Sequence, residues 1–83
     1  MNYFYILKSI RDNKHYFGST DDLQRRVFEH QKGLVASTKS RMPLDLIYYE
    51  AYQSLEAARL RERQVKNSGS ARRALFKRIN SGP

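Results

Sequence analysis

The stretch that decides the fold is residues 3–18, YFYILKSIRDNKHYFG. It opens with five consecutive aromatic or aliphatic residues (3–7), a composition typical of a β-strand. Asp12 and Asn13 then predict a turn, because both residue types tolerate the backbone angles of tight turns. Residues 15–18, HYFG, predict a returning strand, so we expect an antiparallel hairpin.

The position of the turn determines which side chains share a face. If Asp12 and Asn13 are the two turn residues, Ser9 lies opposite Tyr16. Side chains alternate between the faces of a strand, so Tyr5 and Tyr16 then fall on one face. A register slip of one residue would separate them.

A helix is expected after the hairpin, over residues 22–32. Hydroxyl and acidic residues at 19–22 suit its N-terminus, and Gly33 suits its end. Helical spacing places Arg26 at the edge of the apolar stripe, whereas Arg25 points away from it. We therefore expect Arg25 to be solvated and Arg26 to flank the core.

The remaining chain predicts a loop, one strand and two helices. The polar residues 33–43 form the expected loop, and residues 44–52, LDLIYYEAY, the strand. Two capping serines, Ser54 and Ser70, predict helices over residues 55–66 and 71–80. The order is strand, strand, helix, strand, helix, helix, in one domain over residues 1–80 with a flexible tail at 81–83.

Charge is unevenly distributed along the 83 residues. Sixteen Lys and Arg against eight Asp and Glu leave a net charge of +8. Residues 59–83 hold eight of the basic residues and only one acid, Glu62. A polyanionic partner is the physical expectation, and nucleic acid is the commonest one. The alternative is a solvated basic segment that only keeps the protein soluble.

Composition also excludes several classes of protein. The chain has no cysteine, which rules out disulfides and cysteine-ligated zinc. The longest apolar run near the N-terminus has five residues, too short for a signal peptide or a membrane span. We expect an untargeted cytoplasmic protein without a membrane partner.

Glu62 is the strongest anomaly, because helical spacing puts it on the apolar face of its helix. A carboxylate there is costly unless it is paired or binds a metal. A salt bridge to a neighbouring Arg or Lys is one outcome. The other is Mg²⁺ binding, provided that phosphate oxygens and waters complete the octahedron.

Arg26 and His30 lie four residues apart, so they are neighbours on one helix face. An arginine can hold phosphate oxygens, and a histidine can orient a water or move a proton. The alternative is that Arg26 pairs with Asp22 and His30 lies at the edge of the core. Tyr5 and Tyr16 can each be packing residues, and a catalytic tyrosine would need help in losing its proton.

Three motifs resemble one known family. They are Tyr3-Phe4-Tyr5 followed after ten residues by Tyr16-Phe17-Gly18, the segment 18–30, and the segment 59–66, RLRERQVK. Their order resembles that of the GIY-YIG nucleases, in particular the short stand-alone bacterial members, over residues 3–66. The resemblance implies an α+β fold, a three-stranded antiparallel sheet flanked by helices. It also implies cleavage of DNA phosphodiester bonds with one Mg²⁺ or Mn²⁺ ion.

The resemblance assigns roles to five residues. Tyr5 would be the general base, Tyr16 would orient the water or phosphate, and His30 would assist the base. Arg26 would stabilise the transition state, and Glu62 would hold the metal. Expected DNA contacts are one glycine, at which the backbone approaches closely, and seven basic residues: Gly18, Lys39, Arg41, Arg59, Arg63, Lys66, Arg72 and Arg73.

The chain departs from the family pattern in a few places. Tyr3 stands where the family has glycine, and both triplets have phenylalanine in the middle, which should alter packing more than chemistry. An asparagine downstream of the glutamate assists many members; Asn67 and Asn80 are both candidates. There is no added DNA-binding domain, so we expect structure rather than sequence selectivity, in DNA repair or processing. A non-catalytic nucleic-acid binding module and a module targeted by a protein partner are the alternatives.

Overall fold

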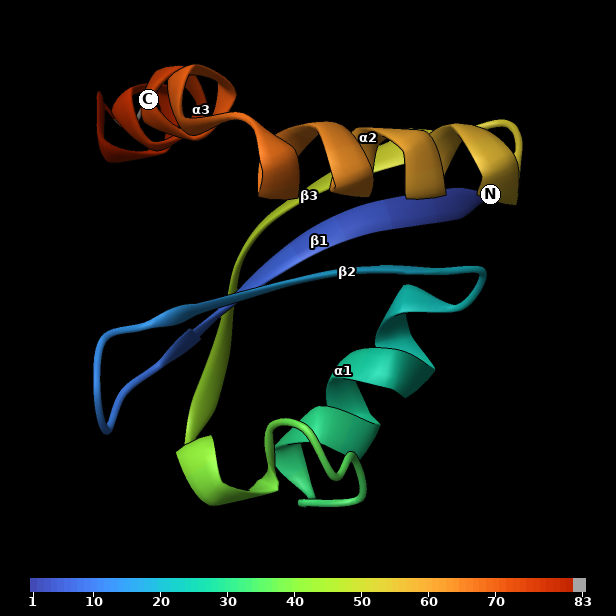
Figure 1. Ribbon diagram of the computed structural model, residues 1–83. Coiled ribbons are helices and arrows are strands. Elements are labelled where there is room, and N and C mark those ends of the chain that lie inside the picture. Colours follow the sequence, from blue (N-terminus) through green and yellow to red (C-terminus); the bar gives the residue numbers. More distant parts are fainter. Residues whose placement is uncertain (82–83) are drawn as a thin grey trace.

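The computed structural model describes residues 1–81, and the expected order of elements is confirmed (Figure 1). The chain forms β1 (Asn2–Ser9), β2 (His15–Thr20), α1 (Leu23–Gln31), the 3-10 turn η1 (Lys39–Arg41), β3 (Leu44–Tyr52), α2 (Leu55–Asn67) and α3 (Gly69–Ser81). The strands form an antiparallel sheet in the order β2-β1-β3, as the resemblance implied. Helix α3 extends through Ser81, the first residue of the expected tail, and residues 82–83 lie outside the described part of the chain.

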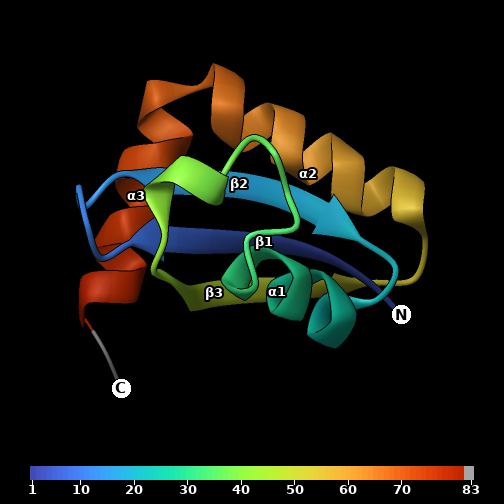
Figure 2. The same ribbon diagram turned by 90° about the horizontal axis from the view of Figure 1, so that it is seen from below.

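Helices cover both faces of the sheet. In Figures 1 and 2, α2 and α3 lie on one face, and α1 lies on the other together with the loop that carries η1. The central strand β1 supplies both cores, because its side chains alternate. Phe4 and Ile6 pack under α2 and α3, whereas Tyr5 and Leu7 pack on the α1 side.

The register of the hairpin differs from the expected one. Leu7, not Ser9, lies opposite Tyr16. The turn is longer than two residues: the backbone N–H of Ser9 donates to the carbonyl of Lys14, and Asn13 takes the left-handed conformation at φ 61°. Because the register moves by two residues, Tyr5 and Tyr16 still share a face, and both contact the α1-side core.

Side chains cap the helices, although not always at the expected residue. Asp22 accepts from the N–H of Arg25 at the start of α1, and Ser54 accepts from the N–H of Ala57 at the start of α2. The prediction of Ser70 as the last cap is wrong. Ser68 accepts from the N–H of Ala71, so α3 follows α2 almost without a connection.

Within residues 1–81, none of the helices combines the length and the apolar character needed to cross a bilayer.

Candidate active site

Three aromatic side chains from three elements meet between the sheet and α1. Tyr5 from β1 and Tyr16 from β2 have ring centroids 6.4 Å apart. The ring of His30 lies 5.9 Å from that of Tyr5 and 5.0 Å from that of Tyr16. The expected shared face thus brings together the two predicted catalytic tyrosines and the predicted histidine.

A buried chain of hydrogen bonds joins Tyr5 to the loop below α1. The Tyr5 hydroxyl lies 3.0 Å from Nε2 of His30, and Nδ1 of His30 lies 2.7 Å from the hydroxyl of Thr38. His30 and Thr38 are fully buried and Tyr5 almost so. His30 therefore lies in the core and not at its edge. Thr38 was not predicted, because its position depends on the path of the loop.

Burial moves the pKa values of Tyr5 and His30 in opposite directions. Desolvation raises the pKa of Tyr5 to about 12, although hydrogen bonding by the Arg26 guanidinium opposes the shift. Desolvation, aided by the positive charge of Arg26, lowers the pKa of His30 to about 4. At neutral pH both groups are therefore uncharged.

The two adjacent arginines of α1 differ as expected. The side chain of Arg25 is 63% exposed and lies 3.7 Å from Asp21, whereas that of Arg26 is 36% exposed. The partner of Arg26 is not Asp22 but Glu29, at 3.2 Å. Asp22 is engaged as the helix cap.

The structure gives a steric reason for glycine at position 18. Gly18 lies opposite Tyr5 in the sheet, and a Cβ built on it would overlap the Tyr5 hydroxyl oxygen and would lie 2.5 Å from Cζ of the ring. The close approach that glycine permits here is therefore that of the Tyr5 ring. Its expected contact with nucleic acid stays a prediction.

Glu62 lies on the α2 side of the sheet and is held by two donors. The Ser19 hydroxyl donates to Oε1 at 2.6 Å, and the Lys66 ammonium donates to Oε2 at 2.6 Å. The Glu62 side chain is only 19% exposed, which agrees with its expected place on the apolar face of the helix. The salt bridge that we weighed as an alternative is present, with Lys66. The contact with Ser19, which is 43 residues away in sequence, had no signal in the pattern.

A polar groove of about 350 Å³ runs between the start of α1 and α2. Arg25, Arg26 and Glu29 line it from α1, and Leu55 and Arg59 from α2. The end of β2 forms its floor, including Ser19. Glu62 lies next to the groove, because Ser19 donates to it. Tyr5 also lies next to the groove, beside Arg26. The groove thus connects the two faces of the sheet around its β2 edge.

The residues around Glu62 fit a divalent cation only as a site with one carboxylate ligand. Within residues 1–81, His, Asp and Glu form no cluster of three that could hold a metal. One carboxylate is sufficient for Mg²⁺ when substrate phosphates and waters supply the other ligands. Lys66 already places a positive charge on Oε2, so a metal ion bound by that oxygen would require Lys66 to move.

The other predicted DNA contacts are dispersed. Lys39 and Arg41 lie on η1, toward the hairpin end of the sheet and away from the groove (Figure 2), and Arg41 faces Asp12. Arg72 donates to the carbonyl oxygens of Val65 and Lys66, so it caps the end of α2.

Arg63 lines a separate shallow hollow on α2, which Asn67 shares, and Arg73 is exposed on α3. Asn80 lines another hollow, beside His15. Of the predicted DNA contacts, Arg59 lines the groove. Lys66 does not line it, but it donates to Glu62, which lies next to the groove. Neither asparagine lines it.

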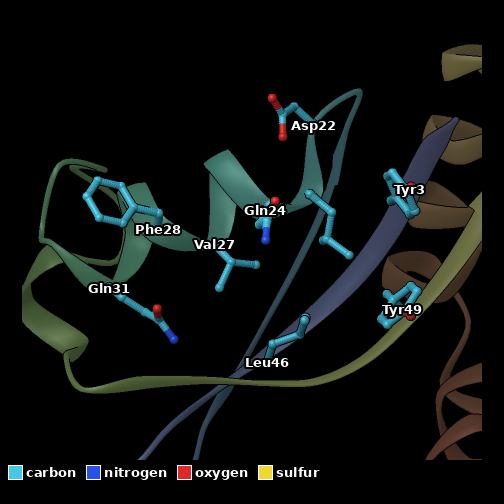
Figure 3. Close-up of a pocket in the computed structure, with 9 residues that line it drawn as sticks. Tyr3, Asp22, Gln24, Val27, Phe28, Gln31, Leu46 and Tyr49 are labelled. Atoms are coloured by element: carbon cyan, nitrogen blue, oxygen red, sulfur yellow. The ribbon is translucent and has the colours of Figure 1, made fainter.

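A larger hollow lies elsewhere, between α1 and β3 (Figure 3). Its volume is about 610 Å³, and Val27 and Leu46 project toward it, with Tyr3 and Tyr49 at the strand side. Phe28 also lines it, but its ring points outward from α1. Its one charged lining residue is Asp22, whose carboxylate caps the helix. We assign the candidate site to the smaller groove, because that groove brings charged and titratable groups together.

A second polar cluster, on the α2 side of the sheet, was not predicted from the sequence. Glu50 on β3 accepts from the hydroxyls of Tyr48 and Tyr52 and from the guanidinium of Arg61. Despite desolvation, the Arg61 hydrogen bonds hold the pKa of Glu50 below its ordinary value. The spacing of Tyr48, Glu50 and Tyr52 at alternate positions was a readable signal that they share a face.

Known proteins of similar sequence agree with this architecture. A UPF0213 protein of Clostridium perfringens is 39% identical over 67 residues, covering 80% of this chain and 71% of its own. A UPF0213 protein of Bacillus pumilus is 34% identical over 76 residues, covering 90% and 76%. The solution NMR structure of a UPF0213 protein from Bacillus halodurans is 33% identical, with a TM-score of 0.58 over 100% of this chain and 89% of that one. The family model described as the GIY-YIG catalytic domain matches residues 1–78. The chain therefore belongs to the GIY-YIG family, a family of nucleases.

Proposed function

We propose that this protein is a metal-dependent endonuclease that hydrolyses phosphodiester bonds of DNA, with a preference for structure over sequence. One observation carries the proposal. Ser19, which lines the same groove as Arg26, donates to Glu62 at 2.6 Å. A phosphate-binding arginine and a cation-binding carboxylate thus border one groove, beside a tyrosine that can exchange a proton.

Tyr5 is the proposed proton acceptor for the attacking water, as a phenolate that has first lost its own proton to solvent in the groove. Its pKa of about 12 has to fall for this role, and Arg26 acts in that direction because positive charge favours the phenolate. Tyr16, whose ring lies beside those of Tyr5 and His30, would restrict the position of the water.

Arg26 is the proposed ligand of the reacting phosphate. Its guanidinium can donate two parallel hydrogen bonds to phosphate oxygens, and these strengthen as negative charge grows in the transition state. Arg25 and Arg59 line the same groove, so they would hold the neighbouring phosphates of the strand.

Glu62 is the proposed ligand of one Mg²⁺ or Mn²⁺ ion. The ion would supply positive charge that stabilises the leaving oxygen and a Tyr5 phenolate. Ser19 would keep the carboxylate oriented, and Lys66 would be released from Oε2 toward the phosphates.

The test is cleavage of nicked, branched and single-stranded DNA by the purified protein with Mg²⁺ or Mn²⁺. We expect Glu62→Gln and Tyr5→Phe each to reduce the rate by about 10²-fold or more. Glu56→Gln, an exposed carboxylate in the first turn of the same helix, is the matched control and should cut normally. If the protein cuts none of these substrates, or if Glu62→Gln cuts as fast as the parent, the proposal fails.

One observation favours a second candidate, a nucleic-acid binding module without cleavage. Lys66 already neutralises Glu62, and Arg25, Arg26 and Arg59 make a groove for phosphates without any metal. Binding should then persist in Glu62→Gln and weaken steeply with salt, with a slope of about −0.9 per phosphate contact on duplex DNA. Any metal-dependent product would exclude this as the sole role.

A further inference from the structure

Thr38 is buried against the candidate site, and no role has been assigned to it so far. It lies in the loop between α1 and β3, directly before η1, and its side chain is fully buried. Its hydroxyl lies 2.7 Å from Nδ1 of His30. Among residues 1–81, His30 is the only hydrogen-bond partner of that hydroxyl.

This single partner restricts where the protons lie. A neutral imidazole has one N–H and one lone pair, and a threonine hydroxyl always carries a proton that must be donated. If Nδ1 of His30 carried the proton, the Thr38 hydroxyl could only accept, and its own proton would be buried without an acceptor. Unpaired buried donors are costly and rare in folded proteins.

We infer that the Thr38 hydroxyl donates to Nδ1 of His30, which fixes the imidazole proton on Nε2, so that His30 donates to the Tyr5 hydroxyl oxygen. Thr38 is thus a positioning residue that acts on Tyr5 through His30. The two distances, 2.7 Å and 3.0 Å, accommodate this directed chain from Thr38 to Tyr5. The low pKa of His30, about 4, agrees with an imidazole that has a single N–H at neutral pH.

The consequence for the site rests on the proposed function. A His30 that donates to Tyr5 cannot also take the proton of Tyr5. The Tyr5 proton must instead point away from His30, toward the groove beside Arg26, where solvent can accept it. Thr38 has no such outlet, because it is 0% exposed whereas Tyr5 keeps 1%. The Nε2–H is then left in place to stabilise a phenolate. His30 would then assist the base as a hydrogen-bond donor and not as a proton acceptor.

The tautomer can be measured without any nuclease assay. Long-range ¹H–¹⁵N correlation spectra at pH 7 distinguish the protonated ring nitrogen, because Nε2 couples to both carbon-bound ring protons and Nδ1 mainly to one. The chain has two histidines, so His15→Gln identifies the His30 signals. We expect Nε2 to be the protonated nitrogen. Protonation at Nδ1 would overturn the inference.

Two substitutions test the part played by Thr38. Thr38→Ser keeps the hydroxyl and should retain the parental ¹⁵N pattern. Thr38→Val has nearly the same shape without the hydroxyl, and the Nδ1 resonance should move because its hydrogen bond is lost. A Thr38→Val protein with parental amide spectra and an unchanged Nδ1 resonance would show that Thr38 does not donate to His30. If Thr38→Val does not fold, the tautomer of the parent protein and the Thr38→Ser spectrum still decide.

The activity readout separates this inference from the proposed function. We expect Thr38→Val to cut about 10–100-fold more slowly and Thr38→Ser to recover, as for other residues that orient a site side chain. An inactive parent with protonated Nε2 would defeat the nuclease proposal and leave this inference standing. An active parent with protonated Nδ1 would do the reverse.

Discussion

The two faces of the sheet bury polar groups in opposite ways. On the α2 face, Glu50 receives donors from two tyrosines and from Arg61, whose guanidinium also lies 6.0 Å from the ring centroid of Phe4. On the α1 face, Tyr5 and His30 are linked to each other and to Thr38, all of them uncharged at neutral pH.

We interpret the Glu50 cluster as part of the structural scaffold and the Tyr5 cluster as part of the candidate site. Around Glu50 the charges cancel, which fixes the position of Arg61 and of the helix that also carries Glu62. Around Tyr5 the charges do not cancel: Arg26, at the edge of the groove, favours a phenolate, and Glu62 opposes it. A group in such surroundings responds strongly when a cation or a phosphate arrives.

The largest effect should come from breaking the Glu50 cluster. Glu50→Gln leaves Arg61 without its counter-charge and replaces one of the two acceptor oxygens by an NH₂ donor, so we expect the free energy of unfolding to fall by about 3 kcal/mol. Urea denaturation measures this loss. Asp45→Asn, an exposed change on the same strand, should stay within about 0.5 kcal/mol. A Glu50→Gln protein of unchanged stability but lost nuclease activity would reverse the distinction between scaffold and site.

Acid should weaken the α1 face first. The pKa of His30 is about 4 when folded and 6.5 in an ordinary histidine, so between these pH values the unfolded chain binds the extra proton. The free energy of unfolding should therefore fall as the pH drops from 6.5 to 4, by about 2–3 kcal/mol. Glu50, with a lowered pKa, contributes a loss only below about pH 4.5.

Unfolding curves between pH 7 and pH 4 test this order. His30→Gln should remove most of the slope in that window. His15→Gln should retain most of it, although the burial of His15 lowers its pKa in the same direction. An unchanged slope in His30→Gln would mean that the imidazole does not titrate as its burial requires.

A smaller effect is expected at Gly18. A methyl group there meets the ring of Tyr5, which His30 holds from the other side, so we expect Gly18→Ala to cost about 1–3 kcal/mol. Gly69→Ala is the control, since a Cβ there lies 3.4 Å from the flexible end of Arg73. The ¹⁵N resonances of His30 should move in Gly18→Ala and not in Gly69→Ala. Equal stability of the two variants would show that the Tyr5 ring is free to shift.

Local patterns predicted most of the fold and the pieces of the site. The third strand was expected at residues 44–52 and is found as Leu44–Tyr52. Helical spacing distinguished Arg26 from Arg25. These inferences succeeded because they depend on periodicity within one element. Tyr5 and Tyr16 share a face as expected, although the pairing used to infer it was wrong, because a shift of two residues keeps every side chain on its face.

Contacts between elements were not predictable in the same way. The bond from Ser19 to Glu62 depends on how α2 crosses the sheet, and the bond from Thr38 to His30 on the path of a loop. The pairing in the hairpin was misplaced by two residues because a four-residue turn was read as a two-residue one. Each of these depends on geometry that no single window of sequence contains.

The groove is assembled from two separate parts of the chain. All three strands and α1 lie within the first 52 residues, which supply Ser19, Arg26 and both tyrosines. The carboxylate proposed to bind the cation comes from α2 and meets Ser19 only when that helix docks on the sheet. A chain cut short before α2 would thus carry the tyrosines and the arginine without their proposed metal ligand.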